Sequence, residues 1–177
     1  MPKLIEPTIK YKDSFLRGEE EMRKEKRTTM SSHLNMKKGE DFGLFVERLK
    51  GYSEGKDLPE GFVSESVCWL VEGDRYIGRI AIRHELTEHL KKVGGHIGYI
   101  IRPSERKKGY GKKILELALE KCQELGLKKV LVTCDEDNTA SRKIIESNGG
   151  IFENKVKDNE NEPAKLRFWI VRGMFAG

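Results

Sequence analysis

The sequence has few of the residues that stabilise secreted or membrane-inserted proteins. Its 177 residues include three cysteines, Cys68, Cys122 and Cys134, and their odd number and spacing argue against a disulfide framework and a zinc motif. All three lie in apolar-patterned segments, which indicates small core residues. No apolar run approaches the roughly 20 residues of a membrane span, and the N-terminus lacks the apolar core of a signal peptide. We therefore expect a cytoplasmic protein with no membrane partner and no metal.

Aromatic residues are also scarce, at 8% of the chain, whereas charged residues reach 36% with a net charge of +5. Most cations alternate with acids, as in residues 19–27, and such alternation is typical of a solvated helical face. The unbalanced cations are Arg102, Arg106, Lys107, Lys108, Lys112 and Lys113. Because no aromatic-studded basic groove is visible, a nucleic-acid partner is not needed to explain them; nucleic-acid binding stays a third hypothesis.

Hydrophobic periodicity predicts one α/β domain over residues 1–177, with no internal repeat and no domain-scale linker. In the N-terminal part the patterns indicate an edge strand at 4–9, helices at 12–27 and 42–49, a loop at 28–40 and a connector at 51–61. The later strands are expected at 66–72, 75–83, 96–102 and 128–133, with a short helical turn at 89–92 and a closing hairpin of 151–157 and 165–171. Helices are expected between the strands, one ending at Gly126 and one beginning at Asn138.

The most informative segment runs from Arg106 to Lys112 and joins a predicted strand to a predicted helix. The strand stops at Pro103, which has no N–H to continue a ladder, and apolar residues then recur at helical spacing as far as Leu125. A glycine-rich, lysine-bearing loop at a helix N-terminus presents unpaired backbone N–H groups and a positive dipole. The segment therefore predicts an anion-binding site.

Two common phosphate-binding motifs do not match this loop. The nucleoside-triphosphate P-loop requires Gly-x-x-x-x-Gly-Lys-Ser/Thr, but Arg106 and Lys113 occupy its first glycine and its Ser/Thr position. The dinucleotide motif needs a small residue where Ile114 stands. The remaining pattern, Arg-x-x-Gly-x-Gly, resembles the pyrophosphate-binding motif of the GNAT superfamily, the acyl-CoA-dependent N-acyltransferases.

The downstream sequence extends this resemblance. Residues 138–141 and 144–149 are similar to the Asn-x-x-Ser…Glu-x-Asn-Gly segment of many GNAT proteins, and further segments resemble an uncharacterised bacterial subgroup of predicted acetyltransferases. The resemblance covers roughly residues 65–172, the expected acyl-CoA-binding core. It implies the GNAT fold, a mixed, mostly antiparallel sheet of six to seven strands with helices on both faces. Residues 1–61 would then form the variable, helical part on the acceptor side.

The resemblance also implies which residues bind acetyl-CoA as co-substrate. The expected binding residues are Arg102, Arg106, Lys107, Lys108, Gly109, Tyr110, Gly111 and Lys112 at the loop, with Asn138 and Ser141 further along the chain. In the family a backbone N–H on the strand before the loop stabilises the oxyanion, and here Ile100 or Ile101 would supply it. Without the family, Asn138 is interpreted as an ordinary helix cap.

Removing the proton of an acceptor amine requires a base, or a water chain that leads to one. His96 is the titratable side chain closest to the place where GNAT enzymes often carry a base, and His84 is a second candidate. A structural hydrogen-bonding role is the alternative for both. Many family members also use a tyrosine as general acid toward the departing thiolate. Ile145 occupies the matching position, so water or another side chain would have to protonate the thiolate; Tyr99 is expected in the core.

These observations predict an N-acetyltransferase that transfers an acetyl group from acetyl-CoA to a primary amine by direct attack. The acceptor would be a small molecule or a peptide. The alternative is a non-catalytic acyl-CoA-binding module that senses or regulates. The identity of the acceptor, a longer acyl donor and the oligomeric state, a homodimer included, are left open by the sequence.

Overall fold

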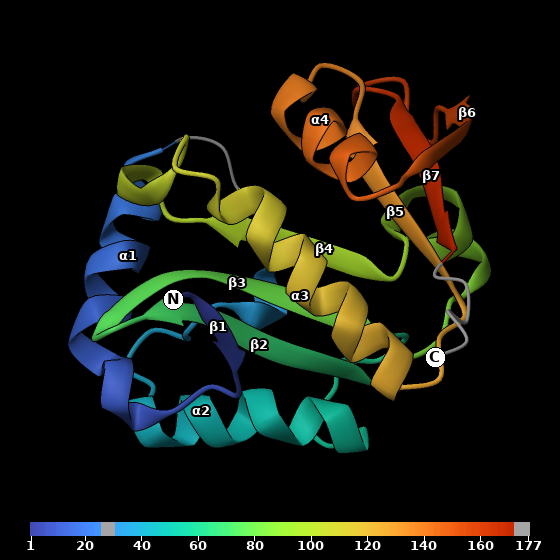
Figure 1. Ribbon diagram of the computed structural model, residues 1–177. Helices are drawn as coiled ribbons and strands as arrows, with labels where there is room; N and C mark the ends of the chain where they lie inside the picture. Colours follow the sequence, from blue (N-terminus) through green and yellow to red (C-terminus); the bar gives the residue numbers. More distant parts are fainter. Residues whose placement is uncertain (26–30, 172–177) are drawn as a thin grey trace.

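The computed structural model describes residues 1–25 and 31–171 (Figure 1). Its strands are β1 (Lys3–Ile5), β2 (Glu65–Glu72), β3 (Arg75–Arg83), β4 (Ile97–Ile101), β5 (Lys129–Asp135), β6 (Ile151–Val156) and β7 (Lys165–Val171). The α-helices are α1 (Lys12–Lys24), α2 (Phe42–Gly51), α3 (Tyr110–Glu124) and α4 (Thr139–Ser147). None of the described helices has the length and hydropathy needed to cross a membrane.

The strands form one seven-stranded sheet in the order β1-β2-β3-β4-β5-β7-β6. Every neighbouring pair is antiparallel except β4 and β5, which run parallel. The expected mixed, mostly antiparallel sheet with helices on both faces is therefore confirmed.

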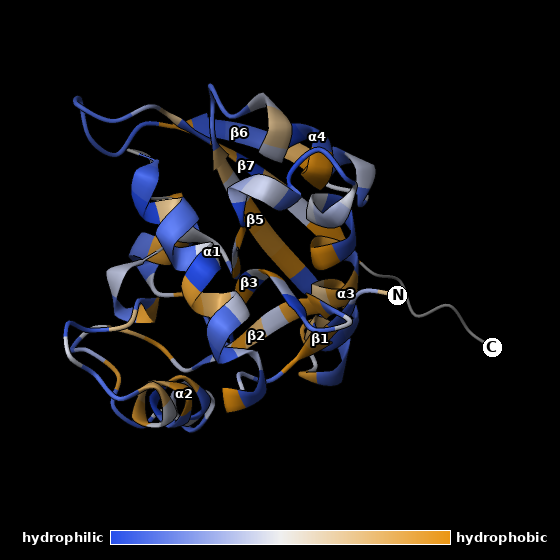
Figure 2. Cartoon of the chain, turned by 90° about the vertical axis from the view of Figure 1, so that its left-hand side faces the viewer, coloured by the Kyte–Doolittle hydropathy of each residue, from blue (hydrophilic) through white to orange (hydrophobic). Residues whose placement is uncertain are grey.

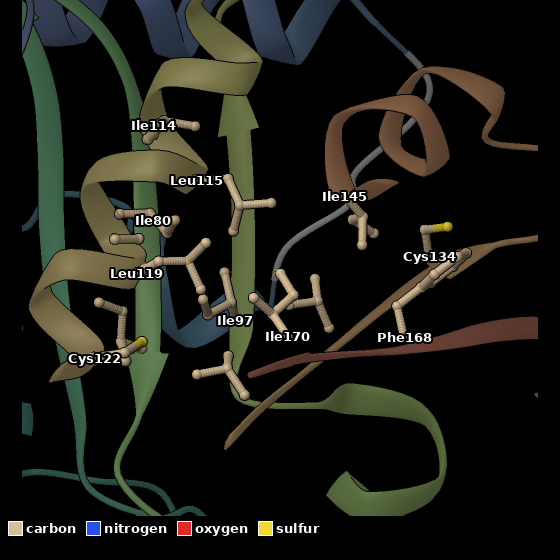
Figure 3. Close-up of a cluster of buried hydrophobic side chains, with 14 of the residues drawn as sticks. Ile80, Ile97, Ile114, Leu115, Leu119, Cys122, Cys134, Ile145, Phe168 and Ile170 are labelled. Carbon is tan, nitrogen blue, oxygen red and sulfur yellow. The ribbon is translucent and has the colours of Figure 1, made fainter. Parts of the chain in front are cut away.

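Helices cover the two faces of the sheet and bury a separate apolar cluster on each. On one face, α3 and α4 supply Ile114, Leu119 and Ile145, which pack with residues such as Ile80 and Phe168 (Figure 3). On the other face, α1 and α2 pack aromatic side chains against Trp69, which is fully buried. Figure 2 shows the outer surface of α1 as predominantly hydrophilic, as expected for a helix that buries one stripe.

The sheet is divided between β4 and β5. These strands share one bridge, Ile97 with Val132, although each continues toward its C-terminal end. Beyond the bridge β5 keeps its full pairing with β7, and Figure 1 shows β5, β6 and β7 leaning away from β1–β4. The backbone groups along the facing edges of β4 and β5 thus open into a wedge instead of a ladder.

The remaining elements agree with the predicted pattern apart from local details. The first strand is shorter than expected, since Thr8 caps a 3₁₀ turn at Ile9–Tyr11. The segment expected as a loop contains a 3₁₀ turn at Ser32–Leu34, and the expected helical turn is a π-turn at Leu90–Gly94. The predicted end of the first helix and start of the following loop, at 26–30, lie outside the described residues, as does 172 at the end of the expected core.

Candidate functional site

The predicted anion loop forms the N-terminus of α3, at the end of β4. The first intrahelical bond runs from the Lys113 N–H to the Gly109 carbonyl at 3.2 Å, and no described side chain caps the helix. The N–H groups of Tyr110, Gly111 and Lys112 therefore have no acceptor within the helix. They point out of the helix end together with its positive dipole, which is the arrangement that binds phosphate.

The two glycines of the motif have different structural roles. Gly109 has a φ of 86°, a left-handed conformation, and a Cβ at this position would have no atom of the described residues within 4 Å. It shapes the turn and leaves space in front of the amides. A Cβ on Gly111 would lie 2.5 Å from Cδ1 of Ile144. The second glycine therefore lets α3 approach α4, beside the wedge.

The lysines of the loop differ in their availability to a ligand. Lys108 donates to the buried Glu105 at 3.1 Å, and Lys113 donates to Glu116 at 2.9 Å. Lys107 and Lys112 are exposed and form no ion pair within the described residues. Lys107 and Lys112 are thus the cations of the loop that are best placed to neutralise a phosphate.

Three predicted side chains in this region have protein partners. Arg102 is buried, contacts Glu21 of α1 and donates to the Tyr76 carbonyl at 3.2 Å, so the structure places its side chain on the α1 face. Arg106 donates to the Ile101 carbonyl at 2.9 Å and to Glu25 at 2.8 Å. The Tyr110 hydroxyl donates to Glu72 at 2.5 Å. Arg102 and Tyr110 can contribute to the loop only through the backbone.

A cavity of about 310 Å³ occupies the wedge between β4 and β5. Its described lining residues come from five parts of the chain: Ser31 and Leu34; Arg83; Val93, Gly94, Ile97, Gly98 and Tyr99; Thr133, Cys134, Asp135, Asn138 and Ser141; and Lys165. Because two diverging parallel strands leave their facing backbone groups unpaired, the cavity has peptide donors and acceptors along both sides. An extended, amide-containing chain fits such a slot.

The cavity brings together Asn138 and Ser141, two of the predicted binding residues, with Tyr99. The Asn138 side chain caps α4, accepting from the Ser141 N–H at 3.1 Å, so its capping role and its position on the cavity wall coexist. The hydroxyls of Tyr99 and Ser141 are 2.9 Å apart and connect β4 to α4 across the wedge. Tyr99 packs against the core as expected, but it also lines the cavity, and burial raises its pKa to about 12.

His96 is held between β4 and β5. Its backbone N–H donates to the Leu131 carbonyl at 2.8 Å, and its Nδ1 accepts the Leu131 N–H at 2.9 Å. Burial, together with the charge of Arg83, lowers the pKa of His96, so the ring is neutral with its proton on Nε2. With Nδ1 occupied, no lone pair of the ring is left to accept a substrate proton.

The second histidine candidate also has a protein partner. His84 Nε2 lies 2.8 Å from the Ser66 hydroxyl, and neither His84 nor His96 is among the described lining residues of the cavity. Ile145 is fully buried in the α3–α4 cluster. The position that carries a tyrosine in many GNAT enzymes is therefore a packing position in this chain.

The backbone of β4 distinguishes between the two candidate oxyanion donors. The Arg102 N–H donates to the Ile77 carbonyl on β3 at 3.0 Å, and the polar groups of successive residues in a strand point to opposite edges. The backbone N–H of Ile100 therefore faces β3, as that of Arg102 does, whereas the N–H groups of Ile101 and Tyr99 face the wedge. The bond from Arg106 to the Ile101 carbonyl agrees with this orientation.

Sequence reasoning missed much of the cavity wall. Arg83, Thr133, Asp135 and Lys165 line it, but they lie at the ends of three separate strands. Arg83 ends β3 and Asp135 ends β5, but β4 lies between these strands and they run in opposite directions, so no local signal in the sequence places the two residues on one wall.

The acetyltransferase (GNAT) domain family matches residues 19–151 of the chain. The chain belongs to this family and is an acetyl-CoA-dependent acetyltransferase, as the loop and the wedge already indicated. No curated protein sequence matches the chain.

Solved structures with the same fold have diverse functions. The chain is similar to the microcin C7 self-immunity acetyltransferase MccE, solved with acetyl-CoA and AMP, with a TM-score of 0.68, 14% identity and coverage of 97% of this chain and 92% of that chain. It is similar to a Salmonella typhimurium acetyltransferase that modifies the N-terminal serine of ribosomal protein L7/L12 (TM-score 0.66, 12% identity, coverage 97% and 95%). It also resembles mutant forms of the spermidine/spermine N-acetyltransferase SpeG from Vibrio cholerae (TM-score 0.61, 15% identity, coverage 97% and 95%). These likenesses show the fold and leave the acceptor open.

Proposed function

We propose that the protein transfers the acetyl group of acetyl-CoA to a primary amine by direct attack in a ternary complex. The observation that carries this proposal is the continuity of the site. The α3 N-terminus offers unpaired amides for a pyrophosphate, and the wedge beside it contains a slot lined by β4, β5 and α4. In this proposal Lys107, Lys112 and the amides of residues 109–112 bind the pyrophosphate.

The pantetheine arm would lie between β4 and β5, with Asn138 and Ser141 on one side. The N–H of Ile101 or Tyr99 faces the wedge, so we assign the oxyanion contact to one of these two donors rather than to Ile100. As the C–S bond breaks, its electron pair goes to sulfur, and the sulfur needs a proton. The Tyr99 hydroxyl, on the wall of the cavity, is the donor that we assign to this step in place of the absent tyrosine at position 145.

The amine must lose a proton to attack the thioester. Because His84 and His96 are both engaged in protein hydrogen bonds, we do not assign this proton to either ring, and we propose that solvent in the cavity accepts it. The acceptor would approach from the side of Ser31 and Leu34, which belong to the N-terminal helical part. In this respect the predicted acceptor-side role of residues 1–61 is retained as a proposal.

The three cysteines are buried and form no disulfide among the described residues. Burial raises the pKa of Cys134, which lines the cavity, to about 11, so its thiol stays protonated and unreactive near neutral pH. A cytoplasmic location and a homodimer remain predictions.

Acetyl-CoA binding and thiol release test the proposed function. Acetyl-CoA should raise the melting temperature of the purified protein, and free thiol should appear when amines and peptides are added. Binding without thiol release for any acceptor would favour the regulatory alternative. Absence of binding would refute both hypotheses. If the protein binds nucleic acid in a salt-sensitive manner and coenzyme A displaces it, the third hypothesis, nucleic-acid binding, would be supported.

A further inference from the structure

The described wall of the cavity carries more positive than negative side chains. Among the described lining residues, the charged side chains are Arg83, Asp135 and Lys165. Lys165 Nζ contacts the Asp135 carboxylate, so these two charges compensate each other. Arg83 is left as the cation whose charge is not balanced by another described residue of the wall.

Arg83 is held firmly in place but not saturated with acceptors. Its Nη1 donates to the carbonyls of Gly94 at 3.3 Å and Gly95 at 3.0 Å, and its Nε lies 4.0 Å from a Glu65 oxygen. Its Nη2 has no acceptor within the described residues and is not among the polar atoms sealed from solvent. One edge of the guanidinium is therefore available to a ligand in the cavity.

Glu65 behind Arg83 compensates this cation only in part. The Glu65 carboxylate is buried and contacts His33 Nε2, whereas its distance of 4.0 Å from Arg83 Nε is too long for a hydrogen bond. Burial lowers the pKa of Arg83, and the attraction of Glu65 opposes this effect. An anion reaching Nη2 would restore part of the solvation that the guanidinium has lost.

We propose that Arg83 recognises an oxyanion on the acceptor, so that the acceptor is an amine that also carries a carboxylate or a phosphate. This inference rests on the proposed function. A guanidinium edge matches the geometry of an oxyanion and binds it more strongly than a neutral oxygen. A polyamine is a poor fit, because the acid on the described wall, Asp135, already pairs with Lys165.

Matched amines measure this preference directly. β-Alanine is compared with β-alaninamide, and phosphoethanolamine with ethanolamine, while 1,3-diaminopropane represents the polyamines. Acetylated products are quantified by mass spectrometry at saturating acetyl-CoA. In the wild type, kcat/KM for at least one anionic member should exceed that of its neutral partner by about tenfold or more. The pair that shows the preference distinguishes a carboxylate from a phosphate.

The Arg83→Gln variant should reduce that ratio toward one, and Arg83→Lys should restore only part of it, because an ammonium lacks the planar fork. Lys92→Gln removes a charge from an exposed neighbour that does not line the cavity, so it should keep the ratio. If Arg83→Gln does not fold, the wild-type ratio is measured at low and high salt, where charge recognition must weaken with salt.

The outcomes separate this inference from the proposed function. Three results obtained together with an acetyl-CoA melting shift would overturn the role of Arg83. They are equal rates for the anionic and neutral amines, a preference for 1,3-diaminopropane, and no acetylation of any anionic amine. A preference that survives Arg83→Gln, or that does not change with salt, also overturns it. Absence of the acetyl-CoA shift overturns the proposed function itself.

Discussion

Replacing Gly109 by Asp or by Asn tests whether the α3 N-terminus binds the pyrophosphate. The two side chains have nearly the same shape and differ in charge, and a Cβ at this position would meet no atom within 4 Å in the part of the chain that the structure describes. At a φ of 86° either residue is strained by about 1–2 kcal/mol, and both tolerate the left-handed region better than most residues do. The two variants should therefore lose similar stability, and the difference in binding isolates the charge.

The expected difference follows from Coulomb's law. A carboxylate about 5 Å from a phosphate charge costs ~0.8 kcal/mol in bulk water and ~3 kcal/mol at the effective dielectric constant of a protein surface. A second phosphate charge increases this repulsion, whereas the exposure of the loop and screening by salt decrease it. We therefore expect a total loss of binding free energy of about 2–3 kcal/mol. Acetyl-CoA should therefore bind the Asp variant roughly 30- to 150-fold more weakly than the Asn variant.

Isothermal titration with acetyl-CoA measures this difference, with S-acetylpantetheine as the control ligand that lacks the phosphates. The two variants should bind the control ligand equally. Equal affinities of the Asp and Asn variants for acetyl-CoA would show that the phosphates bind elsewhere, and the reasoning about α3 would be refuted.

Three further predictions concern the cavity and the α1 face. Tyr99→Phe should lower kcat by about 10- to 100-fold with little change in acetyl-CoA affinity, as steady-state kinetics would show; an unchanged kcat would exclude its hydroxyl as the proton donor to sulfur. The value of kcat/KM for a simple amine should rise about tenfold per pH unit through neutrality toward the pKa of that amine; a plateau below pH 6.5 would instead indicate His96, whose pKa burial lowers. Arg102 lowers the pKa of Glu21 from 4.5 to about 2, so this contact should stabilise the fold above the ordinary pKa and be lost as the pH falls from 4.5 to 2. Glu21→Gln should therefore flatten the loss of stability over that range in denaturant titrations, and an unchanged acid profile would contradict it.

The anion loop could be predicted because its signals are local. A proline that ends a strand, a glycine that allows a left-handed turn and a run of helical periodicity all lie within one segment, from Pro103 to Leu125. The sheet could be predicted from the alternation of apolar and polar residues and from the resemblance to the family. These features depend on backbone preferences that neighbouring residues impose on each other.

The directions of side chains were harder to predict. Arg102 belongs to the basic cluster in sequence, but its side chain crosses to α1 because Glu21 and the Tyr76 carbonyl lie on that face. His96 is one residue before a strand whose partner diverges, and its ring accepts an N–H from Leu131, which lies 35 positions away in sequence. Arg83 lines the cavity with its guanidinium bonded to the carbonyls of Gly94 and Gly95, which belong to the turn before β4. Each outcome depends on contacts between distant segments.

The most direct test of the account is a crystal structure of the protein with coenzyme A. We predict pyrophosphate oxygens within about 2.7–3.2 Å of backbone nitrogens of residues 109–112, and a pantetheine arm between β4 and β5 that separates the hydroxyls of Tyr99 and Ser141. Coenzyme A bound away from the α3 N-terminus, with the wedge still closed by that hydroxyl contact, would contradict the account.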